Sequence, residues 1–237
     1  MSTFKSEIRL DYGDVFTSSS TQGQDLGAPA TTGDGRYFRY VLAGSSTNLV
    51  VGNLQQSSAE VTAIEDLAVA ASAIGANTVT TTSTVTVTAN EYAGGLLIVS
   101  DNTGEGYTYK IASHPAATSA VVTFTLEDPI HIALDTTSTV TVVASPFANV
   151  IINPATASGT PVGVCVFPIT KAQYGWLQVK GPTAVLANGA VTVGTTVVAS
   201  NGVAGAVEPF AGVQQIVGTA INGIVDTEYG PVMFNLP

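Results

Sequence analysis

The chain has 237 residues and a formal net charge of −10, from 7 Lys and Arg against 17 Asp and Glu. Charged residues make up only 10% and hydrophobic residues 45%, which excludes an intrinsically disordered protein, since such a chain is rich in charge and poor in apolar residues. The shortage of Lys and Arg argues against a nucleic-acid binder, and the single cysteine excludes an internal disulfide framework.

Membrane and targeting signals are also missing from the sequence. No uncharged apolar run approaches the ~20 residues that cross a bilayer, and the N-terminal MSTFKSEIRL lacks the apolar core of a signal peptide. We therefore expect a soluble protein that does not pass through a secretion pathway and has no membrane partner. Its surface must consist largely of small and hydroxyl side chains, which cost less to desolvate than ions. This composition favours permanent contact with other proteins.

Residues 1–36 differ from the rest of the chain. The stretch from Thr17 to Gly35 is polar and has almost no apolar periodicity, so it cannot bury enough surface to fold alone. Large apolar residues nevertheless recur before it. We predict an extended N-terminal arm that binds a partner surface; the alternative is an unstructured tail. The candidate contact residues are Phe4, Lys5, Ile8, Arg9, Tyr12 and Phe16.

A β core is expected to begin after the arm. Residues 37–42 are aromatic and β-branched and end at a turn cluster, which predicts a strand. Residues 57–76 are ambiguous, because Ser57-x-x-Glu60 fits a helix capping box whereas the apolar residues that follow alternate with small ones. No helical apolar face is sustained there, so we predict a strand after Ile64.

Residues 77–145 show the plainest strand pattern. Thr alternates with Val at 78–88, and further strand-like runs follow at 96–99, 107–111, 121–126 and 138–143. We predict that 77–145 is an inserted β-rich block, which can protrude from the core. The core itself then comprises residues 37–76 and 146–237.

The strand pattern continues to the C-terminal end. Gly163–Phe167 is continuously apolar, which predicts a buried strand. In residues 173–180, Leu177 and Val179 alternate with more polar or aromatic residues. Asn222-Gly223 predicts a hairpin turn, because both residues tolerate positive φ. Short strands separated by Gly, Pro and Asn predict an all-β fold, a small β-barrel or sandwich.

Candidate catalytic residues are few. His114 precedes a proline and is expected in a solvated loop, and His131 has Asp135 nearby but no nucleophile motif to activate. Cys165 lies within an apolar strand, where a thiol is inert. Residues 101–105 combine carboxylates with a glycine turn but lack the spacing of an EF-hand loop. The sequence therefore predicts no enzyme and no catalytic, metal or cofactor site.

Trp176 is the only tryptophan of the chain. Tryptophan is frequent in interface hot spots because it combines a large area with few rotatable bonds. Tyr174 and Trp176 are therefore candidate interface residues. The alternative is a half-buried Trp with a structural role.

Several segments occur in a familiar order. Tyr174-Gly175-Trp176-Leu177-Gln178, Gly181-Pro182, residues 191–198 and Ile216-Val217-Gly218-Thr219-Ala220 together resemble the capsid-stabilising proteins of tailed bacteriophages, also called decoration or cement proteins. Shorter segments at 35–44, His114-Pro115 and Asp128-Pro129 resemble parts of such virion proteins.

The resemblance implies a small β domain, often with an extended N-terminal arm, bound in many copies to the outer surface of an icosahedral capsid. It implies assembly in the host bacterial cytoplasm, the major capsid protein as partner, and self-association as a homotrimer or, failing that, a dimer. It carries over no catalytic residue and no cofactor.

Two other functional hypotheses are compatible with the sequence. The chain could be a tail or fibre adhesin that binds a host-surface glycan through Tyr107, Tyr109 and Trp176 beside polar loops. It could also be a major capsid or tail-tube subunit, although a major capsid protein of the common tailed-phage type would need a long helix that the sequence does not show.

Overall fold

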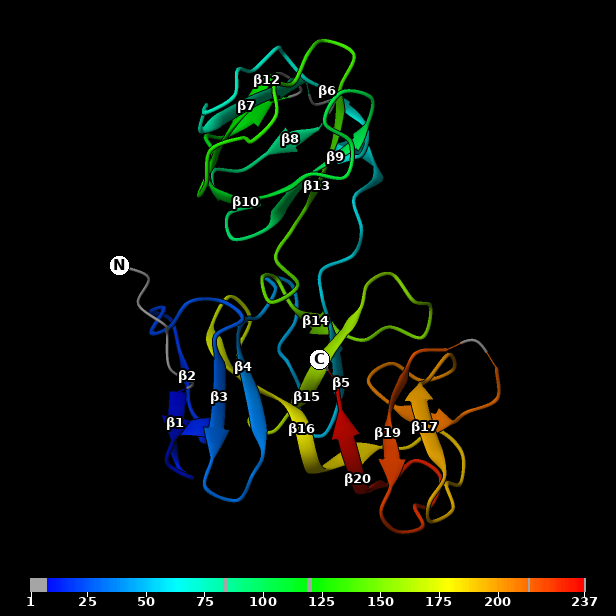
Figure 1. Cartoon of the computed structure of the whole chain (residues 1–237). Helices are drawn as coiled ribbons and strands as arrows, with labels where there is room; N and C mark the ends of the chain where they lie inside the picture. Colours follow the sequence, from blue (N-terminus) through cyan, green and yellow to red (C-terminus); the bar gives the residue numbers. More distant parts are fainter. Residues whose placement is uncertain (1–7, 83–84, 119–120, 213, 237) are drawn as a thin grey trace. The chain divides into compact units, whose positions relative to one another are not determined.

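The computed structural model of the chain describes residues 8–82, 85–118, 121–212 and 214–236. The predicted all-β class is confirmed, because the described residues form strands and two single-turn 3-10 helices, with no α-helix among them. The chain divides into two compact units (Figure 1): unit 1 comprises Met1–Ala59 and Pro146–Pro237, and unit 2 comprises Glu60–Ser145.

Unit 1 is built around one long strand, β16. The strands of this unit are β1 (Ile8–Leu10), β2 (Ser18–Ser19), β3 (Pro29–Thr32), β4 (Tyr37–Leu42), β5 (Leu54–Gln56), β14 (Ile151–Ile152), β15 (Pro161–Cys165), β16 (Tyr174–Leu186), β17 (Thr196–Ala199), β18 (Val207–Pro209), β19 (Ile216–Ala220) and β20 (Tyr229–Asn235), with a 3-10 turn η1 (Asp14–Phe16). The main path of the sheet runs β1-β3-β4-β16-β20-β19-β17-β18. Figure 1 shows β16 between β4 and β20.

Strand β16 changes partner half-way along its length. Its first half pairs with β4 and its second half with β20, and the change occurs near Gly181. Gly181 has φ +98°, and a Cβ there would lie 3.1 Å from Cγ of Arg36, so the position requires glycine. The strand bends at this point. The side-chain amide of Gln178 spans the bend by donating hydrogen bonds to the carbonyls of Lys180 and Pro182.

The second half of β16 belongs to a small barrel. The strands follow in the order β16-β20-β19-β17-β18, and Ala187, just after β16, bridges Val207 of β18 and closes the ring. The interior is filled by aliphatic side chains and one phenylalanine. Its fully buried members include Val185, Val197, Val207, Val217, Val232 and Phe234.

Unit 2 forms a second closed barrel with its own core. Its elements are η2 (Thr62–Ile64), β6 (Leu67–Ala68), β7 (Thr78–Thr82), β8 (Thr86–Val87), β9 (Leu96–Asp101), β10 (Thr108–Ser113), β11 (Ala117–Thr118), β12 (Val121–Leu126) and β13 (Thr139–Val143). The sheet order is β6-β13-β9-β10-β12-β7, and a bridge from Val69 to Thr81 joins the two ends. Valines of the Thr-Val runs point inward, whereas Thr80 and Thr123 pair outside with their hydroxyl oxygens 3.0 Å apart.

The inserted unit begins earlier than the sequence pattern predicts. Its C-terminal boundary after Ser145 matches the prediction, but it starts at Glu60 rather than at residue 77. The reason is that Ile64, Leu67 and Val69 are buried in the core of unit 2. The predicted strand after Ile64 is confirmed as β6.

Residues 8–36 are not a free arm in this structure. β1 pairs in parallel with β3, β3 pairs with β4, and β2 pairs with β16. Val15 and Ala30 are 0% exposed, in a cluster with Trp176. A polar segment that cannot fold alone thus satisfies its backbone groups on an existing sheet.

The predicted hairpin turn at Asn222-Gly223 is wrong. The connection between β19 and β20 spans residues 221–228, and neither residue of the dipeptide has positive φ. Ile224 instead bridges Val191 and is buried in the barrel core. The side chain that follows the glycine therefore sets the loop conformation, because it fills the barrel end.

His114 is buried rather than solvated, contrary to the sequence-based expectation. Its side chain is 3% exposed, and Nε2 accepts a hydrogen bond of 2.9 Å from the backbone N–H of Tyr92. Nδ1 lies 3.0 Å from the carbonyl oxygen of Pro115. The imidazole therefore satisfies backbone groups that the loop before β9 would otherwise bury without partners.

Replacing His114 should destabilise the protein more than replacing the other histidine. His114→Ala leaves the buried N–H of Tyr92 without an acceptor, which costs about 1–3 kcal/mol. His131 is exposed, so His131→Ala is the matched control and should change stability by less than about 0.5 kcal/mol. Urea unfolding of both variants measures the difference, and equal losses would contradict the role given to His114.

Candidate functional site

The most distinctive surface of unit 1 is the outside of its barrel. On β16 and β20, Pro182 lies opposite Met233, Ala184 opposite Pro231, and Leu186 opposite Tyr229. Opposite residues of an antiparallel pair project to the same side of a sheet. Because the alternate residues Val232 and Phe234 are buried in the core, these three pairs project outward.

The same surface extends onto β19 and its following residue. Thr219 lies opposite Met233, and the N–H of Ile221 donates to the carbonyl of Pro231. Tyr229, Met233 and Ile221 are 53%, 47% and 38% exposed. We call this surface the outer face and define it by eight uncharged residues: Pro182, Ala184, Leu186, Thr219, Ile221, Tyr229, Pro231 and Met233.

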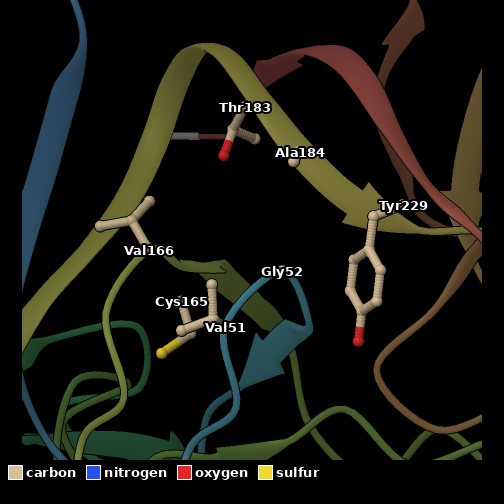
Figure 2. A pocket seen from close by; sticks show the side chains of 7 residues that line it. All are labelled: Val51, Gly52, Cys165, Val166, Thr183, Ala184 and Tyr229. Atoms are coloured by element: carbon tan, nitrogen blue, oxygen red, sulfur yellow. The ribbon is translucent and has the colours of Figure 1, made fainter.

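An apolar pocket of about 280 Å³ adjoins the outer face (Figure 2). Ala184 and Tyr229 belong to both features. The ring of Tyr229 lies against Gly52, where a Cβ would approach its Cδ1 to 2.5 Å and where φ is +74°. Glycine is therefore required for the pocket wall. The lining residues are Val51, Gly52, Cys165, Val166, Thr183, Ala184 and Tyr229.

The outer face and its pocket have the chemistry of a protein contact. The pocket is at the lower end of the roughly 300–1,000 Å³ that drug-sized ligands occupy, and such pockets are mainly apolar with a few polar groups; here it opens beside an exposed apolar surface. Tyrosine and methionine are enriched at the centre of protein interfaces. Contiguous exposed apolar patches on soluble proteins mark interaction sites. The arrangement therefore fits a side chain from another protein surface.

Cys165 forms one wall of the pocket, and its thiol is buried. It is 0% exposed, as the sequence predicts, and its thiol donates to the carbonyl of Phe167 at 2.8 Å. Burial raises the pKa of the Cys165 thiol to about 12. The thiolate needed for reaction is therefore scarce at neutral pH.

His131 and Asp135 have different hydrogen-bond partners. The carboxylate of Asp135 accepts hydrogen bonds from Thr103 and Thr137, whereas the backbone N–H of His131 donates to the hydroxyl of Tyr109.

Within the described part of the chain, no three His, Cys, Asp or Glu side chains lie close enough to hold a metal ion. Nor does any helix among these residues have the length and hydropathy to cross a membrane.

The predicted arm residues have different environments. Ile8 and Phe16 are half-buried against the cluster that contains Trp176. Arg9 is exposed, and Tyr12 is 64% exposed beneath the guanidinium of Arg36 at 5.0 Å. The other two candidates, Phe4 and Lys5, lie outside the described residues.

The two predicted interface residues lie in a stack inside unit 1. The ring of Tyr40 stacks on Tyr174 at 5.9 Å and meets Trp176 edge-on at 4.9 Å. Trp176 is only 6% exposed, so its ring packs against other side chains of unit 1 and leaves little surface for a partner. Tyr174 is half-buried and keeps some accessible surface.

Strand periodicity alone does not identify the outer face, although the sequence contains a signal for it. The run from Tyr229 to Asn235 contains no charged residue in either alternating set. A strand with one face in water normally alternates apolar with polar residues, so a strand that is uncharged on both faces indicates a second buried surface.

Comparisons with models of protein families, with curated proteins and with solved structures found no match for this chain.

The carboxyl of Asp135 should make unit 2 sensitive to strong acid. Hydrogen bonds from Thr137 and Thr103 lower its pKa from 3.8 to about 2. A lowered folded-state pKa contributes stability above the unfolded value, which is lost as the pH falls through the folded value. The stability advantage of wild type over Asp135→Asn should therefore be present above pH ~4 and disappear towards pH ~2.

Urea unfolding at a series of pH values measures this difference. Asp128→Asn, which changes an exposed carboxyl of the same unit, is the control and should differ little from wild type throughout. An Asp135→Asn deficit that stays constant with pH would contradict the assignment.

The thiol of Cys165 should be unreactive until the protein unfolds. Its raised pKa and burial predict that the folded chain reacts with a disulfide reagent at about pH 8 far more slowly than the same chain in urea. Absorbance of the released thiol reports the rate. A folded-state rate close to that in urea would mean that the pocket exposes the sulfur.

Proposed function

We propose that this chain is a structural virion protein that binds the outer surface of an icosahedral phage capsid in many copies. Its role is to stabilise the shell by bridging neighbouring subunits of the major capsid protein. The observation that carries this proposal is the exposed, uncharged outer face beside an apolar pocket, which suits lasting contact with another protein of an assembly, either a capsid subunit or a second copy of the chain. The resemblance of residues 174–182, 191–198 and 216–220 to decoration proteins supports it.

The physical basis of such a role is buried area repeated many times. A standard protein interface buries roughly 1,600 Å² in total, and each copy need contribute only weakly because multiple contacts reinforce one another. The low charge of the chain suits this use, since small and apolar groups are desolvated at little cost. In unit 1, the exposed residue Arg9 is a candidate contact to an acidic capsid surface, and exposed Tyr12 is a further candidate contact.

One observation favours a second candidate, an adhesin that binds a host-surface glycan. In unit 2, the ring of Tyr107 is 42% exposed and stacks on Tyr109 with centroids 6.3 Å apart. Tyr109 is buried and fixes the orientation of the exposed ring. An aromatic face held in this way beside polar loops suits a sugar, whereas buried Trp176 is unavailable for that role.

Capsids that carry the chain should melt at a higher temperature than capsids that lack it. Adding the purified chain to bare capsids should restore the difference, measured by calorimetry, and the chain should sediment with the shells. Electron microscopy of intact virions should show it outside the shell. Capsids equally stable with and without the chain, or density only at the tail tip, would overturn the proposal.

Two variants separate the two candidates. Arg9→Glu should weaken capsid binding, because it reverses an exposed charge of unit 1. Tyr107→Ala should leave capsid binding unchanged, since Tyr107 belongs to unit 2. Glycan-array binding that is lost in Tyr107→Ala would instead support the adhesin.

A further inference from the structure

We propose that the outer face binds a second copy of this chain, with the β20 strands of the two copies antiparallel across a two-fold axis. The inference rests on the proposed function, because the resemblance to decoration proteins implies self-association, and it is tested without capsids. Three observations carry it: the charge at the two ends of the face, the position of Met233 relative to the pocket, and the net charge of the chain.

The two ends of the outer face carry opposite charge. Lys180 lies opposite Asn235 at one end and is exposed. Asp226 and Glu228, both exposed, precede Tyr229 at the other end. Between these ends β20 extends for about 20 Å, at ~3.4 Å per residue. The face is therefore an uncharged strip with one basic end and one acidic end.

This polarity selects one orientation for two copies. If the strands ran parallel, Lys180 would meet the partner's Lys180, and Glu228 the partner's Glu228. In the antiparallel arrangement, each Lys180 instead approaches the partner's Asp226 and Glu228, and symmetry makes this contact twice. Exposed pairs of this kind contribute little affinity, but they determine orientation and discriminate against the alternative.

The same arrangement brings a side chain to each pocket. Counting along the paired strands, Met233 lies on the basic side of Ala184 and Pro231, and Tyr229 lies on the acidic side. A two-fold axis through the Ala184–Pro231 pair places Met233 against the partner's Tyr229, whose ring walls the pocket. Methionine is unbranched and flexible, and its sulfur makes favourable contacts with aromatic rings. It therefore fits an apolar pocket of about 280 Å³.

The net charge restricts where two copies can meet. Each chain carries a formal charge of −10, so most approaches between copies are repulsive. The outer face contains no acidic residue among its eight members. Its footprint, three strands ~4.8 Å apart and about 20 Å long, is smaller than the ~800 Å² per partner of a stable complex. We therefore expect weak pairing that depends on the protein concentration.

The test is sedimentation equilibrium of the full purified chain at a series of concentrations. Wild type should show a concentration-dependent dimer. Met233→Glu should raise Kd by at least about tenfold, because it places a carboxylate beside the partner's pocket and acidic end. Val193→Glu is the matched control, since Val193 is an apolar residue of unit 1 that is 68% exposed and lies outside the outer face. It should leave Kd unchanged.

A charge exchange tests the orientation. Lys180→Glu and Glu228→Lys should each weaken the dimer, whereas the double variant should restore it. Circular dichroism of each variant checks folding. A wild-type chain that stays monomeric, a dimer insensitive to Met233→Glu, or single charge variants that the double variant does not rescue would overturn the inference.

Capsid binding separates this inference from the proposed function. A monomeric chain that sediments with capsids and loses that binding in Met233→Glu would assign the face to the capsid, which overturns the inference and leaves the proposed function standing. A chain that dimerises as predicted but never binds capsids would support the inference and overturn the proposed function.

Discussion

The thirteen-residue strand β16 contributes side chains to all three apolar clusters of unit 1: Trp176 to the first, Leu177 to the second, and Val179 with Val185 to the third. One strand can do this only if it bends, because a straight strand has two faces. The bend depends on a glycine at position 181 and on the Gln178 amide that spans it. The N-terminal sheet and the C-terminal barrel therefore depend on the same backbone geometry. The outer face lies on the barrel side of this bend.

Alternation along the sequence predicts much of this fold. Residues 37–42 and 121–126 form strands with the predicted limits, because β-branched and aromatic side chains fit a pleated surface that is buried on one side. The pattern does not reveal what covers the second face. Trp176 alternates correctly with Leu177 and Val179, yet it is buried because side chains from residues 8–36 pack against it. Coverage of this kind is a long-range property, and no local period encodes it.

Features determined by single contacts were the least predictable. His114 is in a sequence typical of a solvated loop, but its ring is buried because it bonds a backbone N–H 22 residues away. The conformation at Asn222-Gly223 depends on Ile224 filling the barrel end rather than on the dipeptide. The outer face follows from strand register, which places Met233 beside Pro182. Registers between strands about fifty residues apart in the chain are set by core packing, so the grouping of those residues becomes visible only in the folded chain.

The pairing of β5 with β14 has a consequence for the history of the chain. Gln56 lies opposite Ile151, so unit 1 itself brings together the two points between which residues 60–145 leave and return. Any segment whose ends lie close together can be spliced between such points at little entropic cost, because the host has already closed the loop. Unit 2, with its own core, thus resembles a domain inserted into unit 1. The same junction offers a place where a foreign domain could be carried, or where a short turn could take its place.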